Sequence, residues 1–208
     1  MTARLALAIV AAYLLGAIPT SYLVAKRVKG IDLRTVGSGS LGATNLYRVL
    51  GWRFAIPVGM FDALKGATPV AVFGPWAGTT TTGALLLGGT AVLGHVFSVF
   101  INFNGGKGVA TSAGIVLGLA PGAFGVTLAV WGIILSISGY VSLASITAAL
   151  VLPAAIWLVQ PSRRNMVLWF AGLAVVVVWF HRANIKRLLN GTEHRFRAGA
   201  AIPPAGHG

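Results

Sequence analysis

Cysteine is absent from the 208-residue chain, and acidic side chains are almost absent. Without cysteine the chain has no disulfide and no thiolate metal site. The only acids are Asp32, Asp62 and Glu193, against sixteen lysines and arginines. Charged residues make up 9% of the chain, whereas soluble domains carry about 25%. This shortage of charge excludes an ordinary soluble protein and favours a multi-pass membrane protein.

Long apolar runs account for most of the chain. They predict spans over 5–25, 54–73, 79–101, 108–119, 122–137, 141–160 and 165–188. A full span needs about 20 residues, so the run 108–119 is short. It is followed by Ala120-Pro121-Gly122, a break that one continuous helix tolerates badly, although a single kinked helix over 108–137 is the alternative. We therefore expect an all-α membrane protein of about seven transmembrane helices, some of them short or broken.

The positions of the basic residues favour seven spans. With seven, most lysines and arginines fall on one side of the membrane, in the loops 26–53, 102–107 and 138–140 and in the C-terminal segment. The other side holds Arg4, Arg163 and Arg164. Cytoplasmic loops carry an excess of Lys and Arg, so we expect the N-terminus outside and the C-terminus inside. Because these cations are divided among short loops, they indicate contact with membrane lipids and small anions and no nucleic acid.

The two ends of the chain differ in character. The apolar run after Arg4 is long for a signal peptide, and Lys26 and Arg27 follow it, so a retained first span is favoured. We expect one integral-membrane domain over 1–195 and a flexible tail over 196–208, which is rich in Gly, Ala and Pro. Residues 42–50 predict a short or re-entrant helix that does not cross the membrane.

Two glycine-rich segments each run directly into a helix-like apolar segment. They are Gly37-Ser38-Gly39-Ser40-Leu41-Gly42-Ala43-Thr44-Asn45 and Asn104-Gly105-Gly106-Lys107-Gly108-Val109-Ala110-Thr111. Each is paired with a cation, Arg48 in the first and Lys107 in the second. Unpaired N–H groups at a helix start suit phosphate. Ordinary membrane-surface turns also contain glycine, but two such segments on one predicted side, both with cations and hydroxyls, favour phosphate binding.

Neither segment is a nucleotide-binding motif. The first matches G-x-G-x-x-G, with Asp62 at the expected distance, but Asp62 lies within an apolar run and an open parallel sheet cannot face lipid. Lys107 is not a Walker lysine, because Gly108 follows it and no glycine stands five residues before Gly106.

Several isolated polar residues allow two interpretations. Ser38 has no His or acid at a telling spacing, so a hydrogen bond to phosphate is favoured over a nucleophilic role. His95 ends an apolar run and is either a packed residue or a base. Asp62 and Lys65, three residues apart, form either an ion pair or part of an ion pathway. Glu193 stands alone as the only acid in the basic C-terminal region.

Four segments spread along the chain match known motifs. The first runs from Gly37-Ser38-Gly39 to Gly42-Ala43-Thr44-Asn45 with Arg48, and the second from Gly94-His95-Val96-Phe97 to Phe103-Asn104-Gly105-Gly106-Lys107-Gly108-Val109-Ala110-Thr111. The others are Ser142-Leu143-Ala144-Ser145 and Asn184-Ile185-Lys186-Arg187-Leu188-Leu189-Asn190-Gly191-Thr192-Glu193, with His181 just before the latter. Together they resemble the bacterial acyl-phosphate-dependent glycerol-3-phosphate acyltransferases over nearly the whole chain.

The resemblance implies a seven-helix enzyme of the bacterial plasma membrane with its active site at the cytoplasmic face. Such enzymes move an acyl group from acyl phosphate to the 1-hydroxyl of glycerol 3-phosphate, giving lysophosphatidate and phosphate. We expect both substrates as partners, and no cofactor or metal. The expected catalytic residues are Ser38, His95, Lys107, Asn184 and Glu193. The expected substrate- and phosphate-binding residues are Gly37, Gly39, Ser40, Gly42, Ala43, Thr44, Asn45, Arg48, Gly105, Gly106, Gly108, Thr111, Ser142 and His181.

The chain departs from the family pattern at a few positions. Ser40 stands where Asn is usual, Leu41 and Ser98 stand where Pro is common, and Asn104 replaces a usual Lys. The missing cation at position 104 bears on phosphate affinity and leaves the reaction class unchanged. Because an acyl phosphate is already activated, the chemistry predicts direct transfer without an acyl-enzyme.

A membrane transporter for phosphate or another small anion is the alternative. It would use the break at Pro121 and the charged residues Asp62 and Lys65, because transporters place their sites near the midplane at broken helices. The glycine-rich segments, in contrast, are expected at one face.

Overall fold

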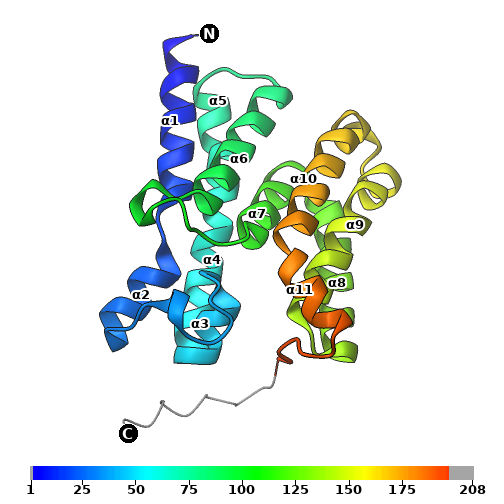
Figure 1. Ribbon diagram of the computed structural model, residues 1–208. Helices are drawn as coiled ribbons and strands as arrows, with labels where there is room; N and C mark the ends of the chain where they lie inside the picture. Colours follow the sequence, from blue (N-terminus) through cyan, green and yellow to red (C-terminus); the bar gives the residue numbers. More distant parts are fainter. Residues whose placement is uncertain (1, 197–208) are drawn as a thin grey trace, which may run out of the picture.

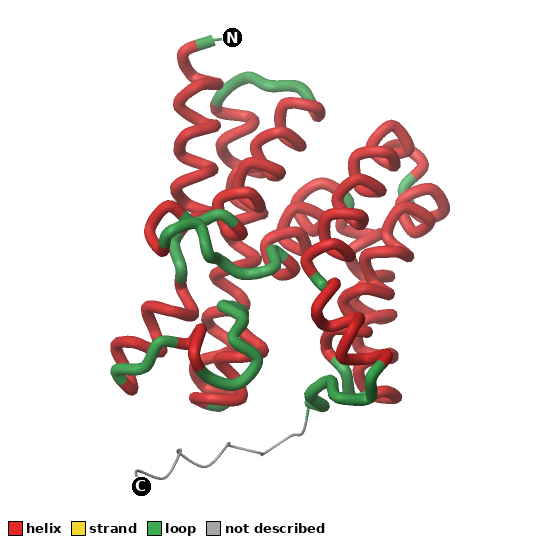
Figure 2. Tube along the Cα trace, viewed as in Figure 1, coloured by secondary structure: helices red, strands yellow, loops and turns green. Residues whose placement is uncertain are grey.

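The protein is helical throughout the part that the structure describes. The computed structural model describes residues 2–196, and within them it has helices joined by loops and no strand (Figures 1 and 2). The α-helices are α1 Ala3–Ala17, α2 Thr20–Lys29, α3 Ala43–Leu50, α4 Trp52–Thr68, α5 Gly74–Trp76, α6 Thr81–Val96, α7 Val109–Leu119, α8 Pro121–Ser138, α9 Val141–Val159, α10 Val167–Phe180 and α11 Arg182–Leu189. A π-helical turn, Pro69–Phe73, joins α4 to α5, and short 3₁₀ helices cover Leu33–Thr35, Val99–Ile101 and Pro161–Met166.

Six helical stretches in residues 2–196 are long and apolar enough to cross a membrane, and α7 is a shorter apolar helix. The six are Ala3–Lys29, Trp52–Trp76, Thr81–Ile101, Pro121–Ser138, Val141–Val159 and Pro161–Phe180. The predicted break before Pro121 is confirmed, because α7 ends at Leu119 and Ala120 leaves the helical region with φ −145°. Pro121 then occupies the first position of α8, where a missing N–H is harmless.

Two predicted spans contain breaks that the sequence analysis did not place. The first span bends between α1 and α2 at Ile18-Pro19. The last predicted span, 165–188, is divided at His181 into the apolar helix α10 and the short, basic helix α11. Of these two helices, only α10 therefore belongs to a stretch that is long and apolar enough to cross a membrane.

Buried polar groups satisfy the carbonyls that the bend at Pro19 frees. The Ser98 hydroxyl donates to the carbonyl of Ala17. Lys65 Nζ donates to the Ile18 carbonyl at 2.5 Å and to Asp62 Oδ1 at 2.6 Å. The interpretation of Asp62 and Lys65 as an ion pair is thus confirmed, and both side chains are almost completely buried. Breaking such a buried pair by removing one partner is strongly destabilising.

Close helix contacts build the half of the molecule formed by α1–α7. Helix α1 packs along α6, and α4 packs along α7. A side-chain carbon added at Gly66 would collide with the Thr111 backbone, and one at Gly114 with the Ala63 backbone. Small residues at such positions allow two backbones to approach closely, as membrane helices do. The second half consists of α8, α9 and α10, with α11 below them (Figure 1).

The two ends of the molecule have different structure. In Figure 1 the start of α1 and the segment α5 lie at the upper end, whereas α2, α3 and α11 lie at the lower end. Helix α3 is the short, non-crossing helix predicted over 42–50. Phe196, at the start of the predicted tail, stacks on Tyr47 with ring centroids 4.6 Å apart. Residues 197–208, the rest of that tail, lie outside the described residues.

Candidate active site

A cavity of ≈ 420 Å³ lies between the two halves of the molecule. Its polar end is formed by the loop before α3, the start of α7, and residues of α11 and the segment after it. Its other end is lined by apolar side chains of α7, α8, α9 and α10, including Val116, Phe124, Leu128, Leu152 and Leu173. One continuous cavity therefore offers a polar compartment and a hydrocarbon-like compartment.

The first glycine-rich segment is held in shape by Asn45. Its Oδ1 accepts the Ser38 N–H at 2.9 Å, and its Nδ2 donates to the carbonyls of Leu33 at 3.2 Å and Val36 at 3.0 Å. Gly37 has φ +60°, and a side chain there would collide with the Asn45 amide. The amide of Asn45 is thus used to fold the loop, and the loop in turn presents the Ser38 side chain to the cavity.

The second glycine-rich segment crosses the end of α6 at very short range. The N–H of Gly105 donates to the Val96 carbonyl at 2.8 Å, and that of Gly106 donates to the His95 carbonyl at 3.1 Å. A side chain at Gly105 would strike these carbonyls, and one at Gly106 would strike the His95 ring. Both N–H groups are already bonded, so these glycines position Lys107 and are not themselves a free anion cradle.

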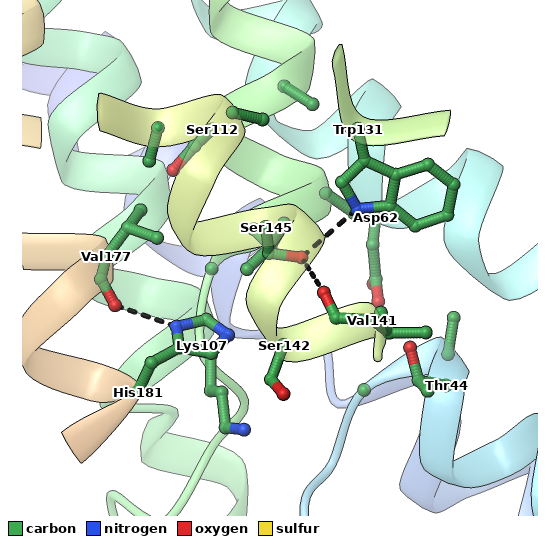
Figure 3. Close-up of a pocket in the computed structure, with 18 of the residues that line it drawn as sticks. Thr44, Asp62, Lys107, Ser112, Trp131, Val141, Ser142, Ser145, Val177 and His181 are labelled. Carbon is green, nitrogen blue, oxygen red and sulfur yellow. Dashed lines mark hydrogen bonds between the residues drawn. The ribbon is translucent and has the colours of Figure 1, made fainter. Parts of the chain in front are cut away.

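Lys107 belongs to a hydrogen-bonded network centred on Glu193. Lys107 Nζ donates to Asn184 Oδ1, and Asn184 Nδ2 donates to Glu193 Oε1 at 2.7 Å. The same oxygen accepts the Ser142 hydroxyl at 2.9 Å, and Arg187 Nε donates to Glu193 Oε2 at 2.7 Å. Glu193 thereby links α9 to α11 beside the cavity. Through Asn184 it is also linked to Lys107, just before α7. Figure 3 shows Lys107 and Ser142 on adjoining sides of the cavity.

The charges of this network favour an anionic occupant. Burial lowers the pKa of Lys107 to about 8, Glu193 opposes this shift, and the cations Arg187 and Arg48 add to it. Burial also lowers the pKa of Arg48, whose guanidinium donates to the His194 carbonyl at 3.3 Å. Burial would raise the pKa of Glu193, but hydrogen bonds from Asn184, Arg187 and Ser142 lower it below its ordinary value. Three cations surround the Glu193 carboxylate, and the other acid that lines the cavity, Asp62, is paired with Lys65. The polar compartment therefore attracts negative charge.

His181 presents a hydrogen-bond acceptor to the cavity. Its Nδ1 lies 2.8 Å from the Val177 carbonyl (Figure 3), and because a carbonyl only accepts, Nδ1 carries the proton. Burial and the neighbouring Lys107 charge lower the pKa of His181 to about 4. The ring is therefore neutral at physiological pH, and Nε2 can accept a hydroxyl proton in a hydrogen bond.

The structure brings most of the predicted site residues together. Those lining the cavity are Ser38, Ser40, Gly42, Ala43, Thr44, Asn45, Arg48, His95, Lys107, Gly108, Ser142, His181, Asn184 and Glu193. Gly37, Gly39, Gly105, Gly106 and Thr111 are not among the lining residues. The first four shape the two loops, and Thr111 lies against Gly66 of α4.

Two residues in or beside the site were not among those that the sequence motifs predict. Arg187, which was attributed to lipid contact, binds Glu193; its spacing of three from Asn184 on one helix was the available signal. Ser112 lines the cavity one helical turn after Gly108, and no pattern in the sequence distinguishes it. Residues 2–196 contain no group of three or more His, Cys, Asp or Glu side chains placed to hold a metal ion.

Comparisons with known proteins agree on one family. The family model described as glycerol-3-phosphate acyltransferase matches residues 6–191. The glycerol-3-phosphate acyltransferase of Chlorobaculum tepidum is 40% identical, over 92% of this chain and 96% of that protein. The enzyme of the same name from Geotalea daltonii is 44% identical, over 95% of this chain and 100% of that protein.

Solved structures agree with this assignment. The glycerol 3-phosphate form of PlsY, an integral membrane glycerol 3-phosphate acyltransferase, superposes with a TM-score of 0.86 at 38% identity, covering 93% of this chain and 96% of that one. The lysophosphatidic acid form of PlsY gives a TM-score of 0.84 at 36% identity, covering 95% and 98%.

Proposed function

The chain belongs to the glycerol-3-phosphate acyltransferase family and is a multi-pass membrane enzyme, and from this premise we propose its substrates, site and mechanism. The acceptor is glycerol 3-phosphate and the donor is an acyl phosphate. The acyl group passes to the 1-hydroxyl of the acceptor, and the products are lysophosphatidate and inorganic phosphate. This is the first acylation in phospholipid synthesis.

The observation that carries the proposal is the division of one cavity into a cationic and an apolar compartment. Arg48 and Lys107 stand at the polar end, and Leu128, Leu152 and Leu173 stand at the other. A substrate that fills both must join an anionic group to a hydrocarbon chain, as an acyl phosphate does. The cations neutralise phosphate charge, and charge-assisted hydrogen bonds of this kind are about twice as strong as neutral ones.

Some of the polar groups bind substrate, and others position the side chains that bind it. Arg48, Lys107 and the Ser38 hydroxyl bind phosphate oxygens. His181 Nε2 orients a glycerol hydroxyl, because that nitrogen accepts a hydrogen bond. Asn184 and Glu193 position Lys107, because their polar atoms already bond to each other and to protein donors.

The acyl group moves directly from donor to acceptor. The acceptor oxygen attacks the carbonyl carbon, a new C–O bond forms, and the bond from that carbon to the phosphate oxygen breaks. The phosphate leaves with the hydroxyl proton. Within residues 2–196 no His or acid side chain bonds to the Ser38 hydroxyl, and the Ser38 N–H bonds to Asn45, so nothing activates this serine as a nucleophile.

Mass spectrometry tests direct transfer. Enzyme incubated with acyl phosphate alone should show no adduct, and a stoichiometric acyl-Ser38 would refute direct transfer.

The active site opens toward the cytoplasm, with the N-terminus of the chain outside and its C-terminus inside. The support is charge: the basic residues of α2 and α11 lie at the same end as α3, and cytoplasmic segments carry the excess of Lys and Arg. We infer that in a bacterial cell the enzyme resides in the plasma membrane.

Purified full-length protein in detergent tests the reaction. With acyl phosphate and glycerol 3-phosphate we expect stoichiometric release of phosphate and formation of lysophosphatidate. Acyl-CoA of the same chain length is the matched control donor and should give no product. In detergent no membrane separates two aqueous solutions, so a transporter has nothing to transport across. Product formation in detergent therefore also distinguishes an enzyme from the anion-transporter alternative. Absence of product with acyl phosphate, together with activity on acyl-CoA, would refute the proposed donor.

A further inference from the structure

Ser112 is a buried cavity residue whose hydroxyl has no hydrogen-bond partner. The residue is 7% exposed. Within residues 2–196 the buried side-chain polar atoms without a partner are Thr111 Oγ1, Ser112 Oγ and Gln160 Oε1, and of these residues only Ser112 lines the cavity. Leaving a buried donor unpaired costs free energy. A cavity occupant that supplies an acceptor would remove this cost.

Ser112 stands where the polar compartment meets the apolar one. Ser112 and Val116 are four residues apart on one face of α7, and Gly108 is the N-cap of that helix. All three line the cavity. Gly108 adjoins Lys107, and Val116 belongs to the apolar end. Along α7, Ser112 therefore lies between the polar end of the cavity, which holds Lys107, and the apolar end, which holds Val116. Figure 3 shows Lys107 and Ser112 among the residues that line the cavity.

Other hydroxyls near this boundary are already committed. Thr127 Oγ1 donates to a carbonyl of its own helix, with Ala123 and Phe124 both 3.0 Å away. Ser145 Oγ donates to the Val141 carbonyl at 2.8 Å and accepts the Trp131 indole N–H at 3.2 Å (Figure 3). Of these three hydroxyls only that of Ser112 is available to a substrate.

Resting on the acyl phosphate donor proposed above, we propose that Ser112 donates a hydrogen bond to the carbonyl oxygen of the acyl group. In an acyl phosphate this carbonyl is the group that joins the phosphate to the hydrocarbon chain. When the acceptor hydroxyl adds to the carbonyl carbon, negative charge develops on that oxygen. It disperses as the bond to phosphate breaks and the phosphate departs with the hydroxyl proton. A donor placed at the developing oxyanion lowers the barrier more than it strengthens ground-state binding.

The kinetic test compares Ser112→Ala with Ser136→Ala in the full-length enzyme. Ser136 on α8 is the matched control, since its hydroxyl donates to the Ile133 carbonyl of its own helix at 2.8 Å and the residue does not line the cavity. We expect Ser112→Ala to lower kcat by about 10²- to 10³-fold, as loss of one oxyanion donor does. Ser136→Ala should stay within about threefold of wild type. Equal activity of Ser112→Ala and wild type would refute the role.

Two non-transferable inhibitors of the same chain length identify the group that Ser112 contacts. A β-ketophosphonate keeps the donor's carbonyl, and an alkyl phosphonate lacks it. Ser112→Ala should weaken the binding of the β-ketophosphonate by roughly fivefold, which corresponds to one neutral hydrogen bond. The same substitution should leave the affinity for the alkyl phosphonate unchanged. Equal weakening of both would indicate a structural effect and overturn the inference. An inactive wild type would instead refute the proposed acyl phosphate donor, and this inference with it.

Discussion

Individual side chains of this protein differ in whether they face substrate or serve their own loops. Arg48 and Lys107 are the cations of the two glycine-rich segments, and both reach the cavity. Asn45 also lines the cavity, but its side-chain amide already forms hydrogen bonds with the backbone of the first loop. The effects of substitution should follow this division.

Removing either cavity cation should disable the enzyme without unfolding it. Arg48→Ala or Lys107→Ala removes a charge-assisted bond to phosphate worth about 1.5–3 kcal/mol, a loss of at least ten- to hundredfold in kcat/KM. Arg163→Ala, in the 3₁₀ helix at the opposite end, is the matched control and should keep near-full activity. Phosphate release by detergent-purified variants measures the effect. Equal losses at Arg163 and Lys107 would mean that the cations act through lipid or membrane insertion.

The activity should fall as the pH rises through the lowered pKa of Lys107. Burial brings that pKa from 10.5 to about 8, so the ammonium loses its proton, and its attraction for phosphate, in mildly alkaline solution. Below that pH the lysine is charged and kcat/KM reaches its plateau. Lys107→Arg keeps the charge and should move the alkaline fall of kcat/KM to higher pH. A profile that is the same in both enzymes would show that Lys107 does not control it.

Contacts between helices determine the positions of these side chains. Helices α4 and α7 approach so closely at Gly66 and Gly114 that backbone faces backbone. Helix α7 carries both Ser112 and the residues that follow Lys107. A change in the distance between α4 and α7 should therefore reach the site.

A methyl group at the α4–α7 contact should destabilise the protein. Gly114→Ala would press on the Ala63 carbonyl, and overpacking of this kind costs about 1–3 kcal/mol. Gly132→Ala on α8 meets no atom within 4 Å, so this matched control should be neutral or slightly stabilising. Thermal unfolding in detergent compares the two. If Gly114→Ala melts at or above the temperature of Gly132→Ala, the close contact does not exist.

The whole molecule is asymmetric from end to end. The basic helices α2 and α11 lie with α3 at one end, and the Pro161–Met166 turn lies at the other (Figure 1). The cavity lies between the half formed by α1–α7 and the half formed by α8–α11, and residues of both halves line it. Its polar groups come from the basic end, which is why we place the active site at the cytoplasmic face.

Sidedness can be measured directly, because the native chain has no cysteine. Single cysteines at Ser40 and Asn190 should react with a membrane-impermeant maleimide only when the cytoplasmic side is accessible. A cysteine at Ser162 should react from outside in intact cells. Labelling of Asn190→Cys from outside would reverse the proposed orientation of the C-terminus.

The amino-acid sequence was enough to predict the membrane class, the helical fold and the break at Pro121. These follow from composition and from local chemistry: apolar runs need lipid, and Pro121 cannot continue α7. The motifs also located most of the polar residues that line the cavity. Local rules did not place the bend at Pro19, where the carbonyls of Ala17 and Ile18 bond to the distant residues Ser98 and Lys65.

Packing between distant helices selects which polar group of each motif faces the cavity. Gly105 and Lys107 are two residues apart, yet one bonds to the end of α6 and the other reaches Asn184, 77 residues away in sequence. Arg187 turned out to bind Glu193, and Ser112 was left with a free hydroxyl at the polar–apolar boundary. The reason is physical: a side chain's residue type fixes what it can bond to, but packing between distant helices fixes which partner lies within reach.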